Sequence, residues 1–197
     1  MRVMKKSSTS RQVICSAGER LFSQFGLSAV GIKVILDEVG IPKGSFYHYF
    51  KSKEAFAVCV AEQYFEQTLA SIEFDEQLDF KENLSTMLTA YHGMLDDLTS
   101  VSPIKGCLLA NLMIEATDNF PELKASVNSL YERWIEQLAQ LFYQGQQQGF
   151  IAKERDTSFM AHVFWNQWQG VVLRLKIDGD KQAAKRSLVQ SVQLMTR

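Results

Sequence analysis

Apolar residues recur at intervals of three and four along almost the whole chain, and this periodicity constrains the fold more than any other feature. Such spacing places apolar side chains on one face of a helix. No segment alternates apolar and polar residues for long enough to predict a convincing strand. The chain is therefore expected to be all-α, with about nine helices and no internal repeats.

Turn-forming and capping residues set the expected limits of these helices. Gly26 ends the first helix, and Gly40-Ile41-Pro42 separates the second from a short third in which Pro42 takes the first position. Ser52 and Asp156 are expected N-caps. The expected helices cover approximately residues 10–25, 31–39, 42–50, 55–72, 80–98, 106–117, 121–145, 157–176 and 180–195.

Composition excludes several classes of protein. Among 197 residues, 46% are hydrophobic and 22% charged, which is typical of a folded chain rather than a disordered one. No apolar run approaches the roughly 18 residues that a membrane helix needs. The basic N-terminus lacks a following apolar block, so no signal peptide is expected.

The cysteines and histidines show no metal-ligand spacing, so neither a metal site nor a cofactor is expected. The three cysteines are far apart and odd in number, which argues against a disulfide scaffold and fits a reducing, cytoplasmic location. The residues concerned are Cys15, Cys59, Cys107, His48, His92 and His162.

Charge is distributed unevenly along the chain. Residues 1–53 carry nine basic and three acidic side chains, a net +6, whereas residues 54–197 carry a net −7. This asymmetry predicts a domain at 1–53 that meets a polyanion and a second domain at 54–197 that does not. The alternative is a chance excess of cations on a solvated face.

The stretch from Ile32 to Phe56 carries the functional signal. Two short helices separated by a tight, glycine-containing turn are typical of a helix-turn-helix. The second helix is short enough to enter the DNA major groove, about 12 Å wide, while the first braces it. Its polar side chains include no carboxylate, as a surface that approaches phosphates requires. They are Lys43, Ser45, Tyr47 and His48.

Two further features of this helix fit that role. Phe46 and Phe50, spaced i, i+4, are expected to anchor it to the rest of the bundle. Gly44 has no side chain and is expected to allow a close approach to DNA.

The segment from Gly40 to Phe56, GIPKGSFYHYFKSKEAF, closely resembles the signature of TetR-family transcriptional regulators. The resemblance covers about residues 10–60 and includes Leu21-Phe22-Ser23-Gln24-Phe25-Gly26. It implies a three-helix DNA-binding head, an all-helical C-terminal body, and a homodimer released from its operator by a small ligand. Gly106-Cys107-Leu108-Leu109-Ala110-Asn111-Leu112 resembles the NemR- and AcuR-like branch.

The resemblance implies DNA contacts residue by residue. Lys33 would face the backbone or a base edge, and Lys53 would contact a phosphate. Lys43 and Ser45 would reach bases. Tyr47 and His48 would contact phosphates or a thymine methyl group, although Tyr47 could instead be a packing residue and His48 a solvent-exposed one.

One departure from the family pattern concerns the second helix. The family commonly has Ser or Thr at its start, as N-cap and phosphate contact, whereas this chain has Ala29-Val30-Gly31. Either Ser28 supplies the cap or the cap is missing, and a missing cap would remove the phosphate contact that the family makes there.

The helix after Asp156 is apolar around most of its circumference, which predicts burial on more than one side. A partner subunit is the economical explanation, with the last helix joining it in a four-helix interface. The alternative is a central core helix of a monomer.

Cys107 follows a loop, opens a helix and lies near Lys105 in the sequence. A thiol in such a position is expected to be more acidic than a free one, and a thiolate is what electrophiles and oxidants attack. Cys107 is thus either a sensor, with Lys176 as a speculative partner, or a small packing residue. Cys15 and Cys59 are expected to be inert core residues.

A non-covalent inducer is the other possibility. Aromatic and soft side chains of the C-terminal body could line a pocket, although at helical spacing they equally fit a plain core. They are Tyr91, His92, Met113, Trp134, Trp165 and Trp168.

Enzyme motifs are missing: there is no glycine-rich phosphate loop, nucleophile elbow or His-Glu-x-x-His. Glu115 and Asp118 are expected on a solvated helix end. The sequence therefore predicts a ligand-responsive, DNA-binding repressor dimer. The alternatives are a small helical enzyme or ligand carrier, or a protein-interaction module without DNA binding.

Overall fold

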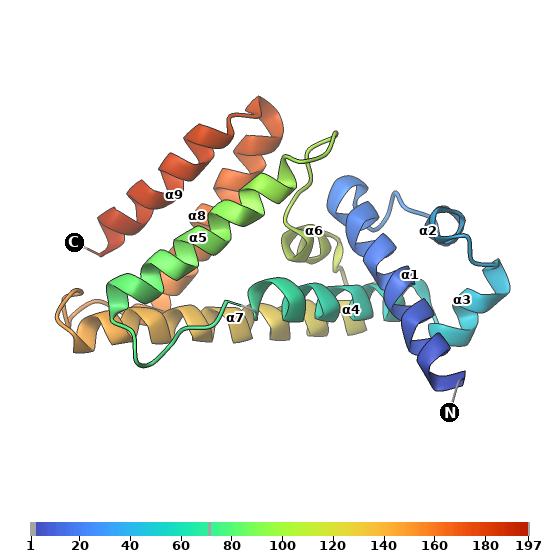
Figure 1. The fold of residues 1–197 in the computed structure, drawn as a ribbon, viewed down its shortest axis with the longest axis horizontal. Helices are drawn as coiled ribbons and strands as arrows, with labels where there is room; N and C mark the ends of the chain where they lie inside the picture. Colours follow the sequence, from blue (N-terminus) through green and yellow to red (C-terminus); the bar gives the residue numbers. More distant parts are fainter. Residues whose placement is uncertain (1–2, 71, 197) are drawn as a thin grey trace. The chain divides into compact units, whose positions relative to one another are not determined.

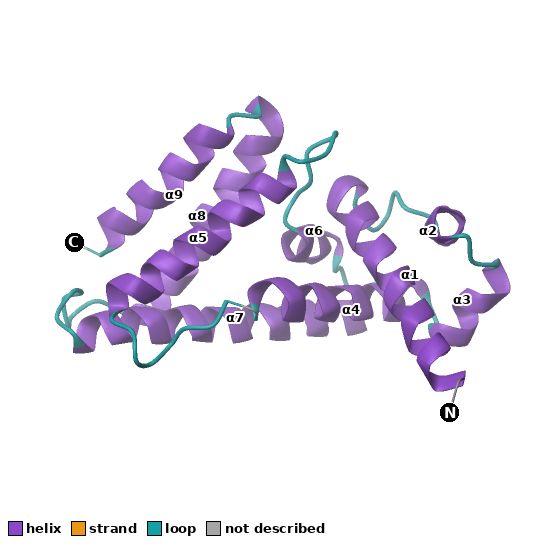
Figure 2. Cartoon of the chain, viewed as in Figure 1, coloured by secondary structure: helices purple, strands orange, loops and turns teal. Residues whose placement is uncertain are grey.

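The structure is a computed structural model that describes residues 3–70 and 72–196, and the side chains of 11–42, 44–70 and 72–196. All regular structure in the described ranges is helical, which confirms the all-α prediction (Figures 1 and 2). The elements are α1 (Val3–Phe25), α2 (Ile32–Val39), α3 (Lys43–Tyr49), α4 (Lys53–Tyr64), the π-helical segment η1 (Phe65–Leu69), α5 (Phe80–Leu98), α6 (Leu108–Glu115), α7 (Pro121–Gln147), α8 (Thr157–Asp178) and α9 (Lys181–Met195).

Local capping explains where several helices begin. The side chains of Ser52 and Asp156 accept hydrogen bonds from the backbone N–H groups of Ala55 and Phe159, so both predicted N-caps are confirmed. Asp79 starts α5 with a reciprocal capping box.

The start of α2 matches one of the two expected alternatives, the missing cap, whereas the start of α3 differs from the expectation. Gly31 occupies the N-cap of α2 without any side-chain cap, so Ser28 does not supply it. Pro42 is the N-cap of α3 rather than its first helical residue. Its extended backbone, with ψ 142°, explains the difference, because a residue inside a helix has a negative ψ.

The chain divides into two compact units. The first unit comprises Met1–Gln67 and Leu108–Leu130, and the second comprises Thr68–Cys107 and Tyr131–Arg197. Residues distant in the sequence thus share a unit, because α6 and the start of α7 belong with the N-terminal helices.

In the first unit α1 packs against α2, α4 and α6, and α2 in turn packs against α3 (Figure 1). Three phenylalanines of the α3–α4 region make its aromatic core: the Phe56 ring centroid lies 5.4 Å from that of Phe46 and 4.9 Å from that of Phe50. Phe46 and Phe50 are buried, so their predicted anchoring role is confirmed.

In the second unit α9 packs against α5 and α8. Buried aromatic side chains from three helices fill its centre, and Tyr91 of α5 contacts Trp134 of α7 and Trp168 of α8. No helix in the described part of the chain is long and apolar enough to cross a membrane.

Candidate nucleic-acid interface and responsive residues

The turn between α2 and α3 is built by a left-handed glycine. Gly40 has φ 65° and its N–H bonds to the carbonyls of Asp37 and Leu36, which closes α2. Pro42 then starts α3 two residues later. The short connection holds the two helices in the arrangement of a helix-turn-helix, with the Phe46 ring as the buried anchor of the second helix.

The outer face of α3 is open and carries no acidic residue. Tyr47 and His48 are exposed and Ser45 is half-buried. Gly44 is also exposed, and a Cβ atom built on it would meet nothing within 4 Å. Lys33 of α2 is exposed as well, whereas the Lys43 side chain lies outside the described residues. The DNA contacts assigned to these positions stay predictions.

Lys53, the predicted phosphate contact, is engaged within the protein. Its ammonium group donates a hydrogen bond to the Leu27 carbonyl at 2.6 Å. Partial burial lowers the pKa of Lys53, while the nearby negative charge of Glu115 raises it. The ammonium therefore supports the α1–α2 turn, and its phosphate contact stays a prediction.

Glu115 is not on a solvated helix end, so that expectation is wrong. Its carboxylate accepts hydrogen bonds from the backbone N–H groups of Leu27 and Ser28, each at 2.6 Å. The expectation failed because these partners lie more than 80 residues away in the sequence. Asp118, by contrast, has a side chain that is 94% exposed and pairs with Lys124.

Gly26 leaves the space that this carboxylate needs. A Cβ atom on Gly26 would lie 2.7 Å from Glu115 Oε1, and its φ of +83° is strained for any other residue. One helical turn before Glu115, Asn111 donates to the carbonyls of Phe22 and Ser23 at the C-terminal end of α1. Together Asn111 and Glu115 attach α6 to the end of α1 and the following turn.

Cys107 is buried and directly precedes α6. Lys105 forms an ion pair with Asp97 at 3.3 Å. Lys176 is exposed near the C-terminus of α8. That end of α8 lies beside the loop before Cys107, because a Cβ atom on Gly179 would lie 3.9 Å from Ile104 Cδ1. The sensor role of Cys107 and the partnership of Lys176 stay predictions.

The aromatic residues predicted for a pocket form a connected cluster in the second unit. Trp134 Nε1 donates to the Tyr91 hydroxyl at 2.8 Å, and the Trp168 ring lies edge-on to Tyr91 at 4.7 Å. Burial raises the pKa of Tyr91, and a charge on Cys107 would raise it further, which indicates that the two groups are close. Trp165 is buried too, whereas Met113 is half-buried on α6 in the other unit.

Three buried polar atoms on helices of the second unit lack a hydrogen-bond partner within the described residues. They are His92 Nε2, Gln137 Oε1 and Gln169 Nε2, one from each of α5, α7 and α8. Buried polar atoms are normally paired, so these three stand out from the rest of the second unit. No group of three potential metal-binding side chains occurs among the residues that the structure describes.

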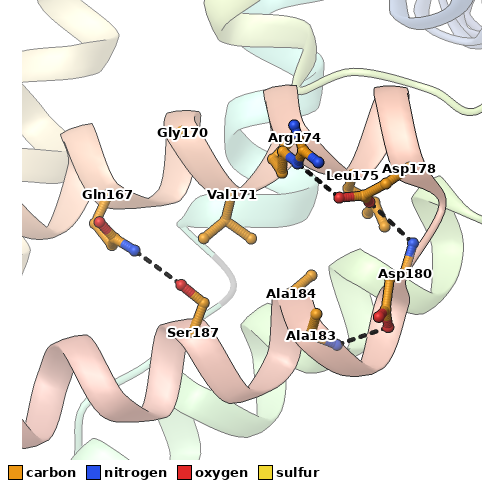
Figure 3. Close-up of a pocket in the computed structure, with 10 residues that line it drawn as sticks. All are labelled: Gln167, Gly170, Val171, Arg174, Leu175, Asp178, Asp180, Ala183, Ala184 and Ser187. Atoms are coloured by element: carbon orange, nitrogen blue, oxygen red, sulfur yellow. Dashed lines mark hydrogen bonds and ion pairs between the residues drawn. The ribbon is translucent and has the colours of Figure 1, made fainter.

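The α8–α9 pair has a groove of about 350 Å³ (Figure 3). A hydrogen bond from Gln167 to Ser187, 3.1 Å long, crosses between the helices, and Arg174 pairs with Asp178 near the α8 C-terminus. Much of α8 is buried within the chain, including Trp165 and Trp168. Large apolar side chains nevertheless remain exposed on both helices: Phe159, Leu173, Ile177 and Leu194.

Sequence reasoning also missed a contact between Cys15 and Cys59. Their sulfur atoms lie 3.0 Å apart on α1 and α4, although each was expected to be a separate core residue. Helical spacing placed both on inner faces, but only the packing of α1 against α4 brings them together.

Two family models match the chain. "Bacterial regulatory proteins, tetR family" matches residues 14–58, and "Tetracyclin repressor-like, C-terminal domain" matches residues 81–190. The first match contains α2 and α3, and the second contains α6 to α8 with most of α5 and α9.

Similar proteins are transcriptional regulators. The transcriptional regulator AcuR of Cereibacter sphaeroides is 31% identical over 87% of this chain and 78% of its own length. The HTH-type transcriptional repressor DhaR of Mycobacterium sp. strain GP1 is 27% identical over 87% of this chain and 85% of its own length.

A solved structure of similar fold is the reduced form of NemR from Escherichia coli. It superposes with a TM-score of 0.78 at 26% identity, covering 93% of this chain and 95% of NemR. The likeness therefore extends over both units rather than the helix-turn-helix alone.

Proposed function

The chain belongs to the TetR family of transcriptional regulators, and from this premise we propose that it is a homodimeric repressor released from a palindromic operator by chemical modification of Cys107. The relatives DhaR, a repressor, and AcuR, a regulator, support a regulatory role rather than an enzymatic one. The observation that best supports DNA binding is the exposed face of α3, which has no carboxylate.

The DNA contacts come from α2, α3 and the start of α4. An exposed, carboxylate-free α3 can enter the major groove, where Ser45 and Lys43 reach base edges. Tyr47 and His48 are free to contact phosphates or a thymine methyl group, and Lys33 faces the backbone. Because the family models fall at 14–58 and 81–190, they support a DNA-binding domain at 1–53 and a sensing domain at 54–197.

The dimer forms through α8 and α9. Leu173 and Ile177 are 67% and 75% exposed, which is costly for large apolar side chains in water. Since the same face occurs on a second copy, a two-fold axis would bring the four helices together and cover these residues. The two α3 helices would then read half-sites about 34–36 Å apart.

The signal travels along α6. Cys107 precedes the helix, and Glu115 at its other end holds the backbone of Leu27 and Ser28. A group added to a buried thiol needs space, so it displaces the start of α6. The displaced helix withdraws Glu115 from the α1–α2 turn, and the turn no longer holds α2 and α3 in register with the operator.

The inducer is proposed to be a reactive electrophile or oxidant. A Cys107 thiolate that attacks an electrophilic carbon forms an S–C bond, and an oxidant converts the same sulfur to a sulfenic acid. The solved structure of the relative NemR is that of its reduced form, which supports an oxidant as a candidate inducer here. Lys176 near the α8 C-terminus is the proposed partner of the modified sulfur.

A non-covalent inducer is a second candidate, favoured by the unpaired polar atoms. A small ligand with donors and acceptors could satisfy His92 Nε2 and Gln169 Nε2 while stacking on Tyr91, Trp134, Trp165 or Trp168. Met113 lies on α6 in the first unit, so it is not part of this proposed site.

The test is a binding titration of the full chain on DNA from its own promoter region, followed by quinones, aldehydes, maleimides and oxidants. Binding should weaken steeply with salt, and electrophiles should release the DNA. Cys107→Ser should bind normally but ignore electrophiles, with Cys59→Ser as the matched control that still responds.

Three outcomes would separate the alternatives. A chain that ignores every duplex at low salt is a helical ligand-binding or interaction module, and the proposal is wrong. Release by electrophiles in the Cys107→Ser variant eliminates the sensor role. Release only by unreactive ligands would favour the aromatic cluster instead.

A further inference from the structure

Cys15 and Cys59 face one another inside the first unit. They are 44 residues apart, yet their Sγ atoms are only 3.0 Å apart. The backbones of α1 and α4 can approach closely because Gly18 has no side chain. A Cβ atom on Gly18 would lie 2.9 Å from Val60 Cγ2, which is closer than a Cβ atom normally comes to another side-chain atom. The packing of two helices therefore keeps the thiols in contact.

The surroundings of the pair favour reaction at one of the two sulfurs. The hydrogen bond from Cys15 lowers the pKa of Cys59 from 9.0 to about 7, and burial opposes this shift. The Arg11 guanidinium also lowers the pKa of Cys59, whereas the Glu62 carboxylate raises it. A thiolate fraction at neutral pH is what makes a cysteine nucleophilic.

The exposed fraction of each side chain also favours Cys59 as the sulfur that reacts first. Cys59 is 7% exposed and Cys15 only 1%. A small oxidant therefore reaches Cys59 first, and Cys15 is already in place as the thiol that resolves the product.

We propose that Cys15 and Cys59 form a second thiol-redox site, separate from Cys107, at which a hydroperoxide converts the pair to an intramolecular disulfide. A disulfide bond is about 2.05 Å long, so the sulfurs need to approach by about 1 Å from their present contact. The site rests on the sulfur contact and does not depend on the DNA-binding function.

The chemistry proceeds in two steps. The Cys59 thiolate attacks the peroxide O–O bond, so that an S–O bond forms, the distal oxygen leaves as hydroxide or alkoxide, and the sulfur is oxidised by two electrons. The Cys15 thiol then attacks the Cys59 sulfur, forming the S–S bond while the S–O bond breaks. The leaving hydroxide takes the Cys15 proton as water. Overall, two thiols and hydrogen peroxide give one disulfide and two waters.

The test uses the full-length native chain and roughly tenfold molar excess of hydrogen peroxide. Trypsin should release Cys15 in the peptide Gln12–Arg20 and Cys59 in Glu54–Lys81. The expected result is a covalent link between these two peptides, removed by dithiothreitol, in the native chain and in Cys107→Ser alike. Cys15→Ser should abolish the link and leave a Cys59 sulfenic acid that a dione reagent traps.

Oxidation of the chain in urea provides the geometric control. The yield of the linked peptides should fall severalfold there, because unfolding separates the two sulfurs. Fully alkylated, unlinked peptides after peroxide would overturn the proposal. So would a link from Cys59 to Cys107 in place of Cys15, or an equal yield in urea.

Discussion

The carboxylate of Glu115, the last residue of α6, accepts a hydrogen bond of 2.6 Å from the backbone N–H of Leu27 in the turn that leads into α2. A charged acceptor makes this bond stronger than one between neutral groups. The contact fixes the turn from which the helix-turn-helix begins, so its loss should affect both stability and operator binding.

Glu115→Gln tests this contact. The amide keeps the size of the side chain but loses the charge, and we expect the free energy of unfolding to fall by about 1.5–3 kcal/mol in urea titrations. Operator affinity should fall as well. Asp118→Asn, in the exposed neighbour, should leave both measurements unchanged. Equal effects of the two substitutions would contradict the role of Glu115.

Gly44→Ala separates stability from DNA binding. Alanine favours a helix over glycine, and the added methyl group meets no protein atom, so the unfolding free energy should rise by about 0.5–1 kcal/mol. The same methyl group should keep α3 from the DNA and weaken operator binding about tenfold, or 1.4 kcal/mol. Unchanged affinity would show that DNA does not approach this position.

Lys53→Ala distinguishes a phosphate contact from a structural one. Loss of a phosphate contact should weaken binding to all duplexes about equally and reduce the slope of log affinity against log salt by about 1. Replacing exposed Lys153 by alanine is the charge-matched control. If the salt slope stays constant while the unfolding temperature falls, Lys53 serves only to hold the Leu27 carbonyl.

Leu173→Glu tests the dimer face. A carboxylate on the exposed apolar face of α8 should dissociate the dimer, measured by light scattering after gel filtration, and weaken operator binding because the half-sites are then bound singly. Tyr143→Glu, on exposed α7 surface, provides the control and should remain dimeric. A Leu173→Glu variant that stays fully dimeric would place the interface elsewhere.

Asp96→Asn should show that the ion pairs between α5 and α9 make a contribution to stability that depends on pH. Asp96 accepts hydrogen bonds from Lys185 at 2.7 Å and Lys181 at 2.9 Å, which hold the pKa of its carboxyl below the usual range. A lowered folded-state pKa contributes stability above the unfolded pKa of about 3.9, and this contribution is lost as the pH falls further.

The variant should therefore unfold at a slightly lower temperature than the native chain at neutral pH. In thermal unfolding followed by circular dichroism, the two curves should converge as the pH falls through the folded-state pKa. A difference that grows on acidification would contradict this assignment.

Local sequence determined the helices and the anchor of α3. The N-caps Ser52 and Asp156 and the pair Phe46 and Phe50 act over three or four residues, a range within which spacing alone specifies the contact. The resemblance of Gly40–Phe56 to a family signature identified the helix-turn-helix for the same reason, because the motif is continuous in the sequence.

Tertiary structure alone decided which distant groups meet. Glu115 accepts hydrogen bonds from Leu27 and Ser28, and the Lys53 ammonium donates one to the Leu27 carbonyl. The sulfur atoms of Cys15 and Cys59 are in contact. The partners in these contacts are 26 to 88 residues apart in the sequence. Helical periodicity specifies which face of a helix is buried but not which face of another helix covers it. Side-chain volume at the crossings, such as the missing side chain of Gly18, settles that choice.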